Sequence, residues 1–103
     1  SGVQAELDFA AIPVLEPVPE YIAQGCVPGG TGRNFASYGH KADAMDDYQK
    51  ALLCDPQTSG GLLIAVEPDG VPALEAILAD AGVARHCIGS LLKRSHGPWV
   101  HLR

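Results

Sequence analysis

The chain has 103 residues, of which 47% are hydrophobic, and its 7 basic and 12 acidic residues give a formal net charge of −5. This length fits at most one domain, and this hydrophobic fraction is typical of a globular protein. The acidic balance argues against a nucleic-acid-binding face and against binding to an anionic membrane surface. No apolar run reaches the roughly 18 residues of a membrane span, and no signal peptide is apparent.

The residues that carry reactive chemistry form no recognisable motif. Cys26, Cys54 and Cys87 are odd in number and widely separated, and no two of them form a CxxC pair. This spacing favours reduced thiols, and therefore a cytoplasmic location, over a disulfide framework. The four histidines form no HExxH motif, so the sequence predicts no metal site.

The first half of the chain predicts one strand and two short helices. Residues 3–9 alternate apolar and polar side chains, which predicts a strand whose polar residues, Gln4 among them, face solvent. Residues 10–17 contain two prolines and should form an extended connector, and residues 18–26 favour a short helix. Residues 47–53 favour a second helix.

Asp46 is a suitable N-cap for this second helix. Met45, Tyr48 and Leu52 fall on one face of it. We interpret that spacing as core packing and not as a cofactor site.

The second half predicts strand, helix, strand and strand in that order. The apolar run at residues 62–66 has the pattern of a buried strand, and residues 71–81 have the apolar spacing of an amphipathic helix. Residues 84–93 and 99–103 predict two further strands, joined by a hairpin turn at residues 95–98. This order predicts one α+β domain in which a helix lies on a sheet.

Two glycine-rich segments, both expected to be loops, are the candidate ligand-binding features. Residues 55–61 (DPQTSGG) combine glycines with hydroxyl side chains, and backbone N–H groups in such a loop can bind an anion such as phosphate. Residues 27–34 (VPGGTGRN) match neither the Walker A nor the GxGxxG pattern, although Arg33 could pair with a phosphate. The alternative interpretation is that both segments are ordinary turns.

The same two segments carry a family resemblance. Residues 24–34 (QGCVPGGTGRN) and 53–63 (LCDPQTSGGLL) resemble, in order and spacing, the C-terminal part of selenophosphate synthetase, also called selenide, water dikinase. The flanking stretches VQAELDFAAIPVL, RNFASYGH and IGSL are also similar, so the resemblance covers essentially the whole chain. This family belongs to the aminoimidazole ribonucleotide synthetase-like superfamily.

The resemblance implies a fold and a function. Residues 1–103 would be a single, partial C-terminal domain of α+β class, with a mixed sheet covered by helices and with its N-terminal part missing. The full enzyme would use ATP, Mg²⁺, selenide and water to make selenophosphate, AMP and phosphate, for selenocysteine and selenouridine synthesis. It would be a cytoplasmic homodimer in which this domain adjoins an N-terminal ATP-binding domain.

The catalytic residues of the family have no match in this chain. Its nucleophilic Cys or Sec, the partner Lys and the metal-binding aspartates lie in other segments of the family's sequence. We therefore expect the isolated chain to be inactive, with no catalytic or metal-binding residue and no tightly bound cofactor. The alternative function is a non-catalytic α+β module for ligand binding or dimerisation.

The nucleotide-facing residues expected from the two segments are small or polar. The alternative is that these residues form structural turns specific to the family's fold. They are Gly29, Gly30, Thr31, Asn34, Asp55, Thr58, Ser59, Gly60 and Gly61.

Overall fold

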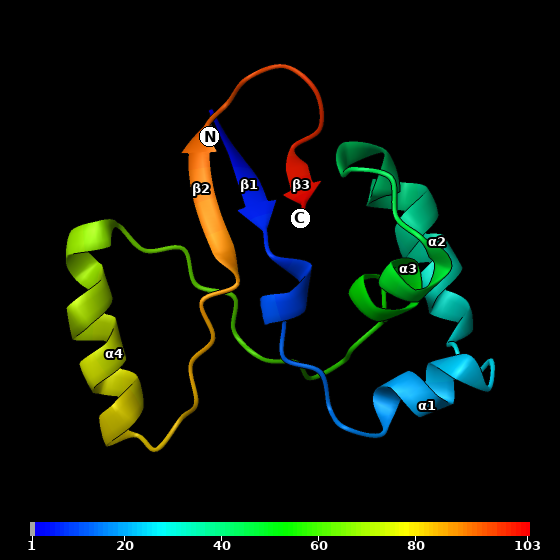
Figure 1. Ribbon diagram of the computed structural model, residues 1–103, viewed down its shortest axis with the longest axis horizontal. Helices are drawn as coiled ribbons and strands as arrows, with labels where there is room; N and C mark the ends of the chain where they lie inside the picture. The colour runs from blue at the N-terminus through cyan, green and yellow to red at the C-terminus, as the bar shows by residue number, and fades with distance from the viewer. Residues whose placement is uncertain (1) are drawn as a thin grey trace.

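A three-stranded mixed sheet lies at the middle of the molecule (Figure 1). The computed structural model describes residues 2–103. The central strand is β1 (Val3–Leu7), which pairs antiparallel with β2 (Gly89–Lys93) at one edge and parallel with β3 (Val100–Leu102) at the other. The predicted α+β class, with a mixed sheet, is confirmed.

The strand predicted at the start of the chain is confirmed as β1, but Gln4 does not face solvent. Its side chain is buried, and its Oε1 accepts hydrogen bonds from the backbone N–H and the hydroxyl of Ser95, at 2.8 and 3.0 Å. The prediction for Gln4 was wrong because a segment ninety residues away in the sequence covers this part of the strand. Alternation along β1 alone could not show that contact.

The hairpin predicted between the last two strands is also wrong. β2 and β3 lie on opposite sides of β1, so residues 94–99 cross over the end of the central strand (Figure 1). The backbone N–H of Arg94 donates to Gly2 O at 2.9 Å, and the N–H of Trp99 donates to Lys41 O at 2.7 Å. The Arg94 guanidinium also lies 4.2 Å from the centre of the Trp99 ring. These contacts hold the crossing segment in place.

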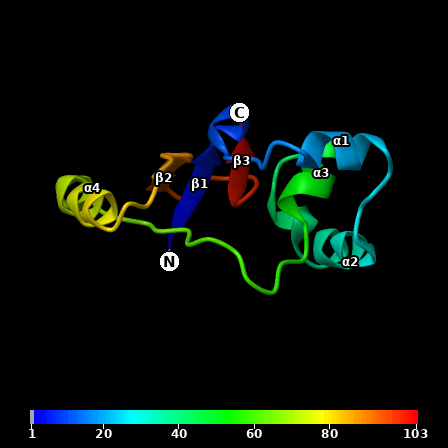
Figure 2. The ribbon, with the colours of Figure 1, turned by 90° about the horizontal axis from the view of Figure 1, so that it is seen from below.

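Three helices gather beside β3, as both views show (Figures 1 and 2). They are α1 (Val18–Ala23), α2 (Gly29–Tyr38) and α3 (Asp47–Leu53), and they follow the short 3₁₀ turn η1 (Phe9–Ala11). α1 and α3 confirm the two predicted short helices.

The glycine-rich residues 27–34 are not a loop, since most of them begin α2. Pro28 is the N-cap, with extended backbone angles (φ −61°, ψ 142°), and the helix begins directly after it. Glycine has a low helix propensity, but α2 packs against α3. We attribute the helix to this tertiary contact, which outweighs the local preference.

α3 begins at the residue that the sequence indicates. The Asp46 carboxylate accepts the N–H of Gln49 at 2.7 Å, and the Gln49 side chain accepts the N–H of Asp46 at 3.0 Å, which completes a capping box. Tyr48 is half-buried and packs edge-on against Phe9, with ring centres 6.0 Å apart. This contact supports the interpretation of the Tyr48 face as packing surface.

The outer edge of β3 is closed by the segment that follows the 3₁₀ turn η2 (Gly39–Lys41). The N–H of Asp43 donates to Val100 O at 2.9 Å, and its carboxylate accepts the N–H of Leu102 at 3.0 Å. The same carboxylate lies 3.3 Å from Nδ1 of His101. This backbone and side-chain pairing occupies groups that an edge strand would otherwise leave open.

Residues 62–66 are not the buried strand that their apolar pattern predicts. Leu62 and Leu63 are 90% and 80% exposed, and no strand of the described residues pairs with this segment. An apolar run becomes a strand only where a neighbouring strand satisfies its N–H and C=O groups. Within the described residues that neighbour is absent.

The fourth helix, α4 (Val71–Asp80), confirms the helix predicted at residues 71–81. Gly82 follows it with φ +65°, a left-handed conformation that suits glycine and ends the helix. However, α4 packs mainly on the preceding 3₁₀ turn η3 (Pro68–Gly70) and stands beside β2 instead of lying on the sheet (Figure 1). The strand–helix unit expected here is therefore not formed.

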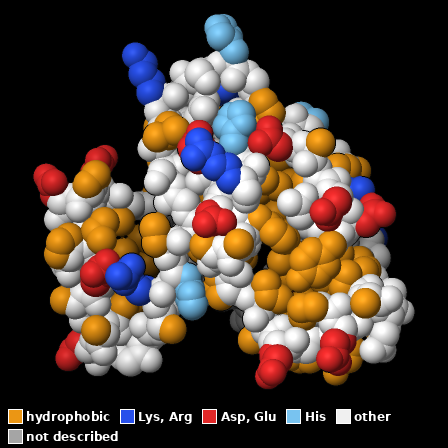
Figure 3. All heavy atoms as spheres, viewed as in Figure 1, with side chains coloured by type: hydrophobic (Ala, Val, Ile, Leu, Met, Phe, Trp, Pro, Cys, Tyr) orange, Lys and Arg blue, Asp and Glu red, His pale blue; other side chains and the backbone are white. Residues whose placement is uncertain are grey.

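The molecule is more extended than a compact domain of this length. Its radius of gyration is 15.2 Å, against about 13 Å for a compact domain of about 100 residues. Ala51, at 8% exposure, is the one buried hydrophobic residue among the described residues. Hydrophobic side chains are visible over α4 and over the α1–α3 group (Figure 3). Much apolar surface thus remains in contact with water.

The three cysteines are free thiols, which agrees with the expectation from their spacing. Among the described residues, no helix combines the length and the apolar character that crossing a membrane requires.

The capping box gives a first prediction. In an Asp46→Ala variant, the Gln49 amide loses its acceptor, and loss of such a cap costs about 0.5–2 kcal/mol. We expect the amides of the first turn of α3 to exchange about 2- to 30-fold faster in hydrogen–deuterium exchange. Asp47→Ala is the control, since the N-cap is Asp46 and Asp47 makes only a solvent-exposed ion pair with Lys50. Equal exchange in the two variants would contradict the prediction.

The exposed apolar residues give a second prediction. The isolated 103-residue chain should self-associate through residues 62–66, because burial of Leu62 and Leu63 removes apolar surface from water. Sedimentation velocity over a concentration series should show a rising sedimentation coefficient, and a Leu62→Asp, Leu63→Asp double variant should remove that rise. A strictly monomeric parent chain at high concentration would contradict it.

Candidate functional site

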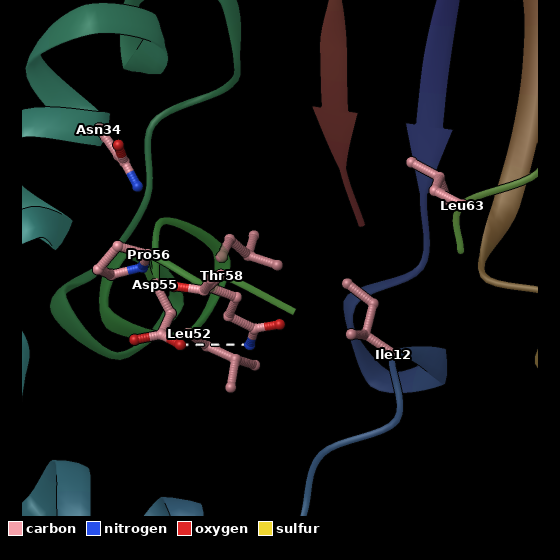
Figure 4. A pocket seen from close by; sticks show the side chains of 9 residues that line it. Ile12, Asn34, Leu52, Asp55, Pro56, Thr58 and Leu63 are labelled. Atoms are coloured by element: carbon pink, nitrogen blue, oxygen red, sulfur yellow. Dashed lines mark hydrogen bonds between the residues drawn. The ribbon is translucent and has the colours of Figure 1, made fainter. Parts of the chain in front are cut away.

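An open pocket of about 780 Å³ lies where the end of α3 and the following loop face the connector after η1 (Figure 4). It takes residues from three separate parts of the chain: the connector, the middle of α2 and the segment from the end of α3 onward. The lining residues are Ile12, Asn34, Leu52, Leu53, Asp55, Pro56, Gln57, Thr58 and Leu63.

Two polar contacts shape the pocket wall. The Asn34 side-chain amide donates to the backbone oxygen of Cys54 at 2.9 Å, which ties α2 to the end of α3. The Gln57 amide donates to the Asp55 carboxylate at 3.2 Å, so the loop folds back on itself. Four other polar groups of the pocket take no part in these two bonds. They are the carbonyl oxygens of Asn34 and Gln57, one carboxylate oxygen of Asp55 and the hydroxyl of Thr58.

The electrostatic character of the pocket is acidic. Asp55 is its one charged lining residue, and no lysine or arginine lines it. A carboxylate repels a phosphate group and attracts a cation or a hydroxyl donor. The pocket by itself therefore suits a hydrated cation or a hydroxylated group better than a bare phosphate, and Arg33, proposed above as a phosphate partner, is exposed and does not line it.

Of the glycines at the start of α2, Gly30 serves packing. A side chain at Gly30 would place its Cβ 2.7 Å from Cγ of Pro56, so a residue without a side chain lets α2 approach the loop. Thr31 is only 4% exposed and its hydroxyl has no hydrogen-bond partner. Neither residue, nor Gly29, lines the pocket, and the buried Thr31 hydroxyl is closed to a ligand in this conformation.

The end of the second segment is exposed and lies outside the pocket lining. Ser59, Gly60 and Gly61 are all solvent-accessible. A Cβ at Gly60 would lie 2.8 Å from the Gln57 side-chain oxygen, so the missing side chain leaves room for Gln57.

Of the nine predicted site residues, the pocket collects three: Asn34, Asp55 and Thr58. Gln57 lies within the predicted segment 55–61 but is not one of the nine individually predicted residues; its amide hydrogen-bonds to the Asp55 carboxylate two residues away. Ile12 was also missed, and no local pattern could place a connector residue opposite this loop.

A second, apolar pocket of about 270 Å³ adjoins the first and shares Leu52, Asp55 and Gln57 with it. Most of its other lining comes from α1 and the proline-containing connector. Within residues 2–103, no group of three or more His, Cys, Asp or Glu side chains is placed to hold a metal ion.

Comparison with known proteins identifies relatives along nearly the whole chain, although no protein-family model matches it. It is 62% identical over 91 residues to the selenide, water dikinase of Yersinia pestis, covering 88% of this chain and 26% of the relative. It is 53% identical over 102 residues to that of Aeromonas hydrophila and 54% identical over 104 residues to that of Cronobacter sakazakii, covering 99% and 100% of this chain. In both cases the match spans 30% of the relative.

The matches to the Aeromonas hydrophila and Cronobacter sakazakii proteins span 99% and 100% of the chain, so the aligned region includes both glycine-rich segments. The chain corresponds to less than a third of the length of the relatives that it matches. By sequence, it belongs to the selenide, water dikinase family.

Proposed function

We propose that the chain is a non-catalytic part of an ATP-dependent enzyme that makes selenophosphate from selenide, ATP and water, releasing AMP and phosphate. The supporting observation is the 53–62% identity, over 88% or more of the chain, to proteins named selenide, water dikinase. The product would serve selenocysteine and selenouridine synthesis in the cytoplasm, and the full enzyme would be a homodimer.

The rest of the full-length protein supplies the catalytic groups in this proposal. Phosphoryl transfer from ATP needs a divalent cation, held by carboxylates, to neutralise the charge on the transferring group. The pocket offers one carboxylate, Asp55, and one such group does not make a Mg²⁺–ATP site. In this proposal, the nucleophile, its partner lysine and the metal-binding aspartates lie in parts of the full-length protein outside this chain, as the family resemblance implies.

In this proposal, the pocket forms one side of the nucleotide cleft. Asp55 and Thr58 face a polar part of the nucleotide or its hydrated cation, because they are the pocket's charged and hydroxyl groups. Asn34 positions the loop through its bond to Cys54. Gly30 lets α2 pack closely on the loop. Gly29, Thr31, Ser59, Gly60 and Gly61 do not line the pocket and have no direct part in this proposal.

The isolated chain gives the first test. Calorimetric titration of the 103-residue chain with Mg²⁺–ATP should show no binding heat, because its pocket has no basic residue for the phosphates. A full-length protein that contains this sequence should bind under the same conditions. Micromolar binding by the isolated chain would contradict the proposal and favour the stand-alone ligand-binding module.

Variants of the full-length protein test the pocket. Asp55→Asn should lower kcat/KM for ATP about 10- to 100-fold, because hydrogen bonds to charged groups contribute about 1.5–3 kcal/mol. AMP formation in the presence of selenide is the measurement. Ser59→Ala is the matched control from the same loop, since Ser59 lies outside the pocket lining. If both variants have the same kcat/KM, Asp55 does not contribute to nucleotide binding or turnover, and the proposal for this residue is wrong.

A further inference from the structure

The basic residues of the chain are partly separated from its acidic residues. Asp80 is the last of the 12 acidic residues, and no Asp or Glu follows it in the sequence. Four of the 7 lysines and arginines lie after it, at Arg85, Lys93, Arg94 and Arg103. A chain with a net charge of −5 therefore ends in a basic segment. The local potential, and not the net charge, decides what binds to such a segment.

The segment that crosses from β2 to β3 brings cations to one end of the molecule, which we call the basic tip. It adjoins the turn η2, because the N–H of Trp99 donates to Lys41 O at 2.7 Å. In Figure 3, a Lys or Arg side chain and a His side chain project from this end. The residues of the basic tip are Tyr38, Lys41, Lys93, Arg94, His96 and Trp99.

The lysines and the arginine of the basic tip have no carboxylate partner among residues 2–103. Lys41, Lys93 and Arg94 belong to none of the ion pairs within this range. The guanidinium of Arg94 donates to the backbone oxygens of Ser95 and Gly97, which are neutral. The three positive charges are therefore available to an external anion.

Two exposed aromatic rings lie beside these cations. Trp99 is 47% exposed, and the Arg94 guanidinium lies 4.2 Å from the centre of its ring. Tyr38 is 67% exposed, and Nζ of Lys41 lies 5.5 Å from the centre of its ring. Trp, Tyr and Arg are the residues that most often dominate the binding energy of protein–protein interfaces. The basic tip thus offers charge and apolar ring surface together.

The crossing segment is held in place before any partner binds. Ser95 donates its backbone N–H and its hydroxyl to the buried Gln4 side chain, and the N–H of Arg94 donates to Gly2 O. A surface that is already ordered loses little conformational freedom on binding.

An extended partner fits this surface better than a small anion does. No residue of the basic tip lines either of the two pockets described above. An open surface encloses too little of a small ion to bind it tightly. A partner chain, in contrast, can contact the cations and the rings at the same time.

We propose that the basic tip binds an acidic polypeptide segment that carries an apolar side chain among its carboxylates. The carboxylates pair with Lys41, Lys93 and Arg94, and the apolar side chain packs on Trp99. A nucleic acid is a poorer partner, because its phosphates extend past the tip and meet the acidic remainder of the chain. This inference does not depend on the activity proposed above.

Tryptophan fluorescence tests the proposal, because Trp99 is the single tryptophan of the chain. The probe is a short peptide of glutamates around a central leucine, titrated into the 103-residue chain. We expect a saturable change in fluorescence, and we expect the affinity to fall as salt is added. A peptide of lysines around the same leucine should leave the fluorescence unchanged.

Several outcomes of this titration would overturn the proposal. The first is the absence of a saturable change with the acidic peptide. Equal or tighter binding of a uridine oligonucleotide would assign the tip to nucleic acid, and equal binding of inorganic phosphate would reduce it to an unspecific anion site. A fluorescence change that follows protein concentration without any peptide would assign the tip to a second copy.

A matched pair of variants provides the second readout. Lys93→Glu should weaken peptide binding at least about fivefold, because it replaces an attraction by a repulsion. Arg33→Glu is the control, since Arg33 is an exposed cation outside the basic tip and the substitution changes the net charge equally. Equal affinities of the two variants would overturn the proposal. If Lys93→Glu does not keep the circular dichroism of the parent chain, Lys41→Glu takes its place.

The full-length protein decides whether the basic tip is open to a separate partner. Calorimetric titration with the same acidic peptide should show binding there too, with the same loss in the Lys93→Glu variant. If the 103-residue chain binds the peptide and the full-length protein does not, another part of that protein covers the tip, and the proposal is wrong.

Discussion

The structure depends on a single central strand that is paired on both edges. β1 lies near the start of the chain and pairs with β2 on one edge and β3 on the other, both of which lie near the end of the chain. Gln4 within β1 anchors the segment that connects β2 and β3. Because β2 and β3 do not contact each other as strands, every sheet hydrogen bond involves β1 or the segment that closes the edge of β3. The helices then lie at the two sides of this sheet, not over it (Figure 1).

The second constraint is the close approach of α2 to the loop after α3. Gly30 lies against Pro56, and Asn34 holds the backbone of Cys54. These contacts fix where Asp55 and Thr58 stand relative to the connector at Ile12, and so they create the pocket. Its acidic character explains why a segment that looks suited to phosphate would need groups from elsewhere to bind one.

The exposed apolar surface and the family relationship have a common explanation. The radius of gyration is 15.2 Å, and Ala51 is the single buried hydrophobic residue among residues 2–103, so the apolar side chains have few partners within this part of the chain. Family members are more than three times as long as this chain. A chain that corresponds to less than a third of such a protein is expected to leave apolar side chains in contact with water, as Leu62 and Leu63 are.

The sequence by itself determined the α+β class, the helices α1, α3 and α4, the strands β1, β2 and β3, and the family. These features depend on local rules, such as the Asp46 cap, the stop at Gly82 and the alternation in β1, or on the linear order of two motifs. Tertiary structure decided the burial of Gln4, the helical state of residues 29–34, the separation of β2 from β3 and the joining of Asn34 to the Asp55 loop. It also decided the exposure of residues 62–66. Each of these depends on a contact between residues far apart in the chain, or on the lack of one, and a local pattern carries no information about such a partner.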